Sequence, residues 1–162
     1  NEKRIDTMVE AFKMAKLSNA ELVLIGDGNQ MQEAKNFTKL HLQSSQIKFL
    51  GIVPHEQIFK FMLNQHISVI NSYGFDTQGM IILEAVACGL PILYADPAMD
   101  EVVPIRGGLR SSNDSVTAMT DAIDQIFAHP TLIEEMSKNI TKAKDSVLQS
   151  TQISKLLELY LK

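Results

Sequence analysis

The sequence has no tryptophan and a single cysteine, and aromatic residues make up only 6% of its 162 residues. With Cys88 alone, the chain cannot form an internal disulfide. A lone small thiol in an apolar segment is more typical of a reduced core residue than of a reactive one. No apolar run approaches the ~18 residues of a membrane-spanning helix. The opening residues, NEKRIDTMVE, do not have the pattern of a signal peptide. We therefore expect a cytoplasmic location.

An excess of basic residues is also absent. Lysine and arginine total 15 against 19 acids, which gives a formal net charge of −4, and the two signs are mixed along the chain. A nucleic-acid-binding protein would carry a basic stripe, so we expect no nucleic-acid partner. The histidines do not have metal-ligand spacing, and each is expected at the surface rather than at a metal site. They are His41, His55, His66 and His129.

Short apolar segments alternate with segments of helical periodicity, over a length that suits one domain. Strands are expected within 20–28, 46–51, 66–72 and 90–96, and helices over 5–17, 30–43, 54–65, 79–88 and 114–128. A last helix is expected from Thr131, where Thr131 and Glu134 have the form of a capping box. Residues 96–110 are expected to form a loop with one short strand. This alternation predicts an α/β fold with a doubly wound parallel sheet.

The chain opens with a helix rather than with a strand, which predicts that the first strand of the sheet precedes residue 1. We therefore expect 1–162 to be one domain cut from a longer protein. Parallel edges exposed beside the missing strand should be filled by rearrangement, by a swapped element or by a partner chain, so homo-oligomerisation is one expected outcome.

The stretch NSYGFDTQGMIILEAVACGLP, residues 71–91, places acids on either side of a glycine that begins a helix. A helix N-terminus attracts phosphate, and Gly79 lets the backbone approach an anion closely. Glu84 lies roughly 7.5 Å further along the helix, near the span from a nucleotide diphosphate to its ribose. Asp76 precedes the helix and would meet the group that the terminal phosphate carries. The pattern predicts a site for a nucleotide sugar.

Plainer interpretations of the same residues remain open. Asp76 could cap the helix, with Thr77 as a competing hydroxyl. Glu84 could face solvent. The sequence Gly26-Asp27-Gly28 is by itself typical of a turn between a strand and a helix.

Taken together, the motifs resemble the C-terminal, donor-binding half of GT-B-fold retaining glycosyltransferases of group 1, family four. The resemblance covers nearly the whole chain and runs in the family order. The matching segments are Glu2-Lys3-Arg4, Gly26-Asp27-Gly28, Phe49-Leu50-Gly51, Asp76-Thr77-Gln78-Gly79, Leu83-Glu84-Ala85 and Gly89-Leu90-Pro91. The resemblance implies a Rossmann-like half of a GT-B fold that lacks its first strand, and a donor that is a UDP-sugar.

The resemblance also implies roles for individual residues. Lys3 would contact the donor diphosphate, although without the family it would be interpreted as a solvated lysine at a helix start. Asp76 would contact the transferred sugar and Glu84 the ribose. Gly26 and Asp27 would line the donor cleft, and Ile52 and Val53 would contact the base. The backbone N–H groups of Gln78, Gly79 and Met80 would contact the phosphates, and Thr77 would also bind the donor.

Two features depart from the family pattern: Asp76 stands where glutamate is usual, and Arg4 where glycine is usual. The family's N-terminal, acceptor-binding domain is absent, so we expect this chain alone to transfer no sugar and to bind UDP weakly at best. In the whole protein we expect hexose transfer, from UDP-glucose or a related UDP-sugar, to a cell-envelope, lipid or protein acceptor. We expect no obligatory metal, and any contact with the inner face of a membrane would come through the missing domain.

Two other functions fit the sequence less well. The shorter acid at Asp76 keeps open a non-catalytic relative that serves as a binding subunit of a glycosylation or secretion complex. A receiver-like or flavodoxin-like module would need an acid cluster after the first strand or a hydroxyl-rich flavin loop, and the sequence has neither.

Overall fold

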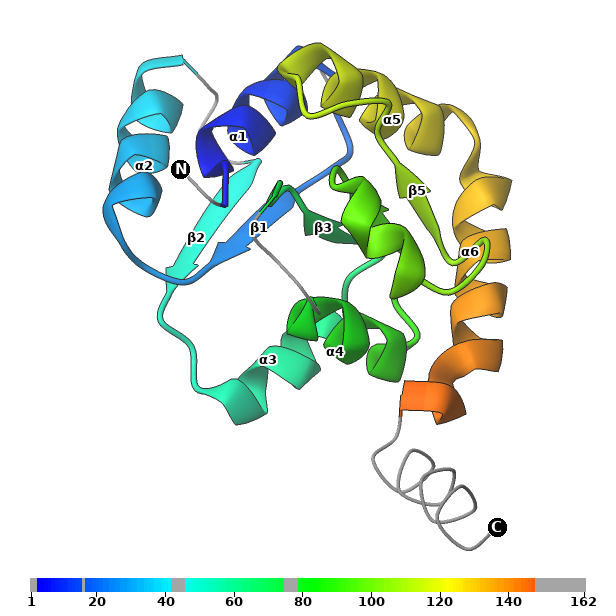
Figure 1. Cartoon of the computed structure of the whole chain (residues 1–162). Helices are drawn as coiled ribbons and strands as arrows, with labels where there is room; N and C mark the ends of the chain where they lie inside the picture. Colours follow the sequence, from blue (N-terminus) through cyan, green and yellow to red (C-terminus); the bar gives the residue numbers. More distant parts are fainter. Residues whose placement is uncertain (1–2, 16, 42–45, 75–78, 148–162) are drawn as a thin grey trace, which may run out of the picture.

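The computed structural model describes residues 3–15, 17–41, 46–74 and 79–147 (Figure 1). Helices and strands alternate along these residues, as the sequence predicts. The helices are α1 (Ile5–Met14), α2 (Asn29–His41), α3 (His55–Met62), α4 (Met80–Cys88), α5 (Val116–Ala128) and α6 (Pro130–Ala143), with short 3-10 helices η1 (Pro97–Glu101) and η2 (Lys144–Val147). The strands are β1 (Leu22–Ile25), β2 (Ile47–Gly51), β3 (Ser68–Ile70), β4 (Ile92–Tyr94) and β5 (Gly108–Arg110).

All strand pairs among these residues are parallel, which confirms the predicted fold class. The hydrogen bonds nevertheless divide the strands into two sheets, β1-β2 and β3-β4-β5, rather than one continuous sheet. In the part of the chain that the structure describes, β1 pairs with β2 alone and β3 pairs with β4 alone. The expected filling of these edges by rearrangement is therefore not seen among the described strands.

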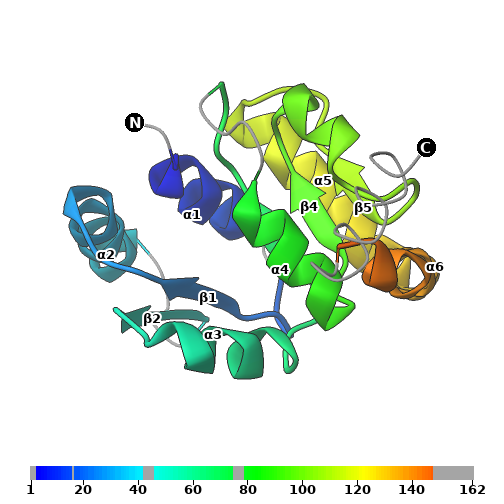
Figure 2. The same ribbon diagram turned by 60° about the horizontal axis from the view of Figure 1, so that its bottom comes forward.

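Helices cover both faces of the strands. Figures 1 and 2 show α1, α2 and α5 on one face and α3 with α4 on the other. Strand β4 is buried on both sides: Leu93 and Ala95 belong to the core under α1 and α5, whereas Ile92 and Tyr94 belong to the core under α4. Because successive side chains of a strand point to opposite faces, β4 separates the two cores.

The starts of α5 and α6 and the presence of η1 differ from the sequence prediction. Helix α6 begins at Pro130, its N-cap is His129, and no side chain caps it, so the predicted capping box of Thr131 and Glu134 was wrong. Proline at the first helical position favours a helix start there, because its fixed φ suits the helix and its missing N–H would be unpaired in any case. Helix α5 has Ser115 as its N-cap, and the Ser115 hydroxyl accepts a hydrogen bond from the Ala118 N–H. Helix η1 was not predicted.

Candidate functional site

Several of the predicted site residues follow the carboxyl ends of parallel strands, the edge at which such sheets bind ligands. Gly26 and Asp27 follow β1, and Ile52 and Val53 follow β2. The Gly26 N–H donates to the Gly51 carbonyl at 2.8 Å, so the turns after β1 and β2 lie side by side. Ile52 is 80% exposed, which leaves an apolar side chain at this edge in contact with solvent.

Gly79 is the N-cap of helix α4 and adopts a left-handed backbone, with φ 49° and ψ 60°. The residue is packed from behind: an added Cβ would lie 2.9 Å from Cδ1 of Ile82 and 3.1 Å from Sδ of Met99. Both the backbone conformation and the space therefore require glycine. Met80, the next residue, is 64% exposed, so the start of this helix is accessible from outside. A helix start of this kind presents unpaired N–H groups to an anion.

Glu84 lies in the second turn of α4 and is largely buried, with 18% of its side chain exposed. Its Oε1 lies 3.9 Å from Nε2 of His55, the first residue of α3. The segment that carries Ile52 and Val53 leads directly into His55. The predicted ribose ligand and the predicted base-binding segment thus lie next to each other, and the interpretation of Glu84 as an exposed surface acid was wrong.

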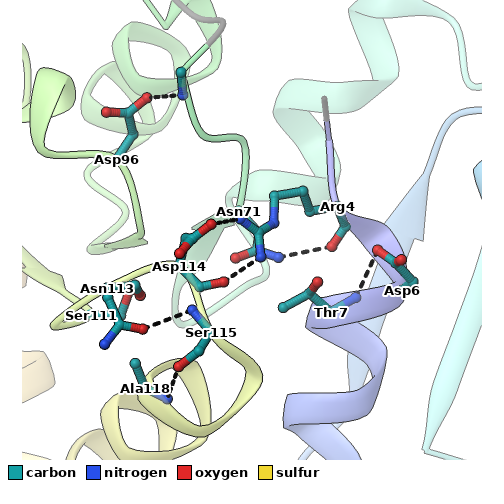
Figure 3. Close-up of polar contacts among 11 residues, drawn as sticks. Arg4, Asp6, Thr7, Asn71, Asp96, Ser111, Asn113, Asp114, Ser115 and Ala118 are labelled. Carbon is teal, nitrogen blue, oxygen red and sulfur yellow. Dashed lines mark hydrogen bonds and ion pairs between the residues drawn. The ribbon is translucent and has the colours of Figure 1, made fainter. Parts of the chain in front are cut away.

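Lys3 is exposed and lies one residue before the N-cap of α1. That N-cap is Arg4, which has a left-handed backbone with φ 48° and ψ 45°. For a residue other than glycine this conformation costs roughly 1–2 kcal/mol. The guanidinium of Arg4 donates to both the carboxylate and the backbone carbonyl of Asp114 (Figure 3). Nδ2 of Asn71 donates to the Arg4 carbonyl at 2.8 Å, so residue 4 contacts both the end of β3 and the segment before α5.

Asp96 follows β4 and is buried, with 5% exposure. One carboxylate oxygen accepts from the Gly74 N–H and the other from the Ala98 N–H (Figure 3). Asp96 therefore fixes residue 74, just before the stretch 75–78. Three predicted site residues, Asp76, Thr77 and Gln78, lie outside the described residues.

Sequence reasoning missed Asn71, Asp96 and Asp114 as residues of this region. Asp96 is the last residue of the segment 90–96 that the sequence predicts as a strand, and that position could have indicated it. Asn71 has a further feature: its Oδ1 is buried and has no hydrogen-bond partner. A buried, unpaired acceptor at the carboxyl end of β3 is costly unless a donor group reaches it.

Among the residues that the structure describes, two groups have shifted pKa values. Burial raises the pKa of the half-buried Cys88 thiol, which disfavours the reactive thiolate and agrees with a reduced core residue. Burial, together with the hydrogen bond from its hydroxyl to Asp100, raises the pKa of Tyr94 to about 12. Within the described ranges, no three His, Cys, Asp or Glu side chains are grouped so that they could hold a metal ion. None of the helices in those ranges is both long enough and apolar enough to cross a membrane.

Comparison with protein families gives one match over most of the chain: the family described as glycosyl transferases group 1 matches residues 1–143. A curated relative, the N-acetyl-alpha-D-glucosaminyl L-malate synthase of Bacillus anthracis, is 26% identical over 166 residues. That similarity covers 98% of this chain but only 41% of the relative, so the chain spans about two fifths of the relative's length.

Solved structures share this fold at low sequence identity. A mutant of S. aureus TarM, in complex with Fondaparinux, alpha-GlcNAc-glycerol and UDP, matches with a TM-score of 0.80 and 18% identity over 100% of this chain and 34% of its own. Anabaena HepE, in complex with UDP and glucose, matches with a TM-score of 0.78 and 17% identity over 98% of this chain and 44% of its own.

Proposed function

The chain belongs to the glycosyl transferases group 1 family, and on this basis we propose that it is the donor-binding half of a retaining glycosyltransferase that uses UDP-glucose or a related UDP-sugar. Its parallel α/β arrangement matches the C-terminal half of GT-B glycosyltransferases. Because it spans only part of its relatives, we propose that a separate domain of the whole protein binds the acceptor. On this proposal the 162 residues alone transfer no sugar.

One observation carries the proposal. The accessible, glycine-capped start of α4 lies five residues before Glu84, and Glu84 faces the start of α3 beside the segment of Ile52 and Val53. The N–H groups at Gly79 and Met80 would hold the diphosphate. Glu84 would accept hydrogen bonds from the ribose hydroxyls, while the segment after β2 would hold the base. The TarM and HepE structures, whose complexes contain UDP, support this choice of nucleotide.

The remaining roles concern the transferred sugar. In the reaction, the bond between C1 of the hexose and the diphosphate oxygen breaks, and negative charge develops on the departing UDP. Lys3 and the N-terminal amides of α4 would stabilise that charge, while Asp76 would bind hydroxyls of the hexose. Stabilisation of this kind works best in a closed site without water, which is the contribution expected from the acceptor domain. The acceptor hydroxyl oxygen would then bond to C1 on the face that the diphosphate leaves, and its proton would pass to an oxygen of the departing UDP.

The test is calorimetric titration of UDP and 2′-deoxy-UDP into the natural protein that contains this chain, with Glu84→Ala and the exposed α6 residue Glu135→Ala as matched variants. Removing a carboxylate that accepts from a ribose should lower UDP affinity ~10–100-fold. The same change should abolish the preference for UDP over 2′-deoxy-UDP, whereas Glu135→Ala should leave both affinities intact. Unchanged affinity in Glu84→Ala would remove the ribose assignment.

A turnover measurement separates the enzyme from a binding subunit. If the natural protein releases UDP from UDP-glucose in the presence of acceptor extracts, it is an enzyme. If UDP-glucose binds and is never consumed, the non-catalytic alternative holds.

A further inference from the structure

Residue 4 is held on two sides by contacts between segments that are far apart in sequence. Its guanidinium donates to the side chain and carbonyl of Asp114, which lies 110 positions later. Its own carbonyl accepts from Nδ2 of Asn71 at the end of β3. Asn71 is only 6% exposed, so this second contact comes from the interior of the protein. Figure 3 shows the three side chains converging at the start of α1.

The backbone at residue 4 is unfavourable for arginine, and glycine would adopt it without strain. Arg4 and Arg106 are the two residues other than glycine with positive φ in the part of the chain that the structure describes. An arginine in this conformation requires compensation from its contacts. The fork of two donors to Asp114 supplies it, because bidentate arginine contacts are strong and fix geometry.

The contacts of Arg4 also restrict the position of the Lys3 backbone, because the peptide between residues 3 and 4 is planar and their Cα atoms lie about 3.8 Å apart. Once the φ and ψ angles of Arg4 are fixed, the direction of the chain from Arg4 back to Lys3 is fixed relative to α1. The Asn71 contact places this point at the end of β3, the strand that precedes α4 in the chain.

We propose that Arg4 and Asp114 form a clamp that positions Lys3 for contact with the donor diphosphate. This inference rests on the proposed function. Arg4 does not touch the donor and acts through Lys3, so it is a positioning residue.

The test uses calorimetry of UDP and UMP binding to the natural protein that contains this chain. Arg4→Gly is the central variant, because glycine keeps the backbone conformation and removes the guanidinium. We expect ~5–20-fold weaker UDP binding in both Arg4→Gly and Asp114→Asn, with UMP affinity changed by less than about twofold. A purely structural contact would instead weaken both nucleotides equally or lower only the melting temperature. Arg4→Lys, which restores one donor, should recover part of the loss.

A double-mutant cycle tests whether Arg4 acts through Lys3. In a Lys3→Ala background, Arg4→Gly should cause less than about a twofold further loss of UDP affinity. Additive losses would overturn the clamp, as would wild-type UDP affinity in Arg4→Gly. The matched control is Lys48→Ala, which breaks the 2.6 Å ion pair with Glu21 at the amino ends of β1 and β2 and should leave UDP binding unchanged.

Failure of the proposed function gives a different result. If the wild-type protein binds no UDP, the donor site and the clamp are both overturned. If the wild type binds UDP and Lys3→Ala weakens it, but the Arg4 variants match the wild type, only the clamp is overturned.

Discussion

Asp96 holds Gly74 in place: its carboxylate accepts the Gly74 N–H at 2.5 Å, while its other oxygen accepts the Ala98 N–H at 2.9 Å. A single buried acid thus joins the loop after β3 to the turn after β4. The loop after β3 leads to the glycine that begins α4, so the contact couples the end of one strand to the proposed phosphate site.

Replacing this acid should destabilise the protein. In Asp96→Asn one amide oxygen can still accept, but the NH₂ group would face a backbone N–H, and the charge is lost. We expect the free energy of unfolding in urea to fall by about 1–3 kcal/mol. Asp124→Asn, at an exposed position of α5, is the control and should change it by less than about 0.5 kcal/mol. Equal values for the two variants would show that the Asp96 contacts contribute nothing.

Substitution of Gly79 should be costly for two separable reasons. Gly79→Ala forces alanine into a left-handed backbone and pushes its Cβ against Ile82 and Met99. We expect a loss of about 2–4 kcal/mol in the free energy of unfolding. Gly74→Ala separates the two effects, because Gly74 also has a positive φ, of 75°, but an added Cβ there would meet nothing within 4 Å. Its cost should be about 1–2 kcal/mol, and an equal cost in both variants would rule out crowding at Gly79.

Tyr94 should make stability depend on pH at the alkaline end. The folded protein holds the Tyr94 proton more tightly than the unfolded chain, whose tyrosine has its ordinary pKa near 10. The stabilisation is complete below pH 10 and is lost as pH rises through about 12. The free energy of unfolding, measured in urea from pH 9 to pH 12, should therefore fall more steeply in the wild type than in Tyr94→Phe. Parallel curves would contradict the assignment.

Two isoleucines provide a matched test of the core. Ile92 in β4 is 0% exposed, whereas Ile105 is 90% exposed. Ile92→Ala removes the same atoms as Ile105→Ala but leaves a cavity between packed elements. We expect a loss of about 2–5 kcal/mol for Ile92→Ala in urea unfolding, and less than about 0.5 kcal/mol for Ile105→Ala.

Local patterns were sufficient to predict the helices and strands because apolar periodicity determines which face of each element is buried. The apolar segment 90–96 predicted a buried strand, and β4, within it, is buried at all its residues. The division into two sheets could not be read in the same way, since pairing between strands depends on contacts between distant segments. The short helix η1 depends on the Asp96 side chain as its cap, which periodicity does not reveal.

The geometry of the candidate site could be predicted from the sequence only where it is local. Gly79 and Glu84 lie on one helix, so their separation follows from helical rise alone. Arg4 and Asp114 are 110 positions apart in the sequence, so local patterns could not predict their contact. The sequence indicated only that an arginine stood where the family usually has glycine. The partner of Glu84, His55, also belongs to a different βα unit.

The separation of β1-β2 from β3-β4-β5 has a consequence for how the two sheets are coupled. Among the described strands, no ladder of backbone hydrogen bonds crosses from one sheet to the other. Side chains of α1, with Met8, Val9 and Phe12 in the core shared by Leu22 and Leu93, bridge the two parts instead. Apolar contacts tolerate small sliding movements better than a ladder does, so the two sheets are coupled through the packing of α1 rather than through backbone hydrogen bonds.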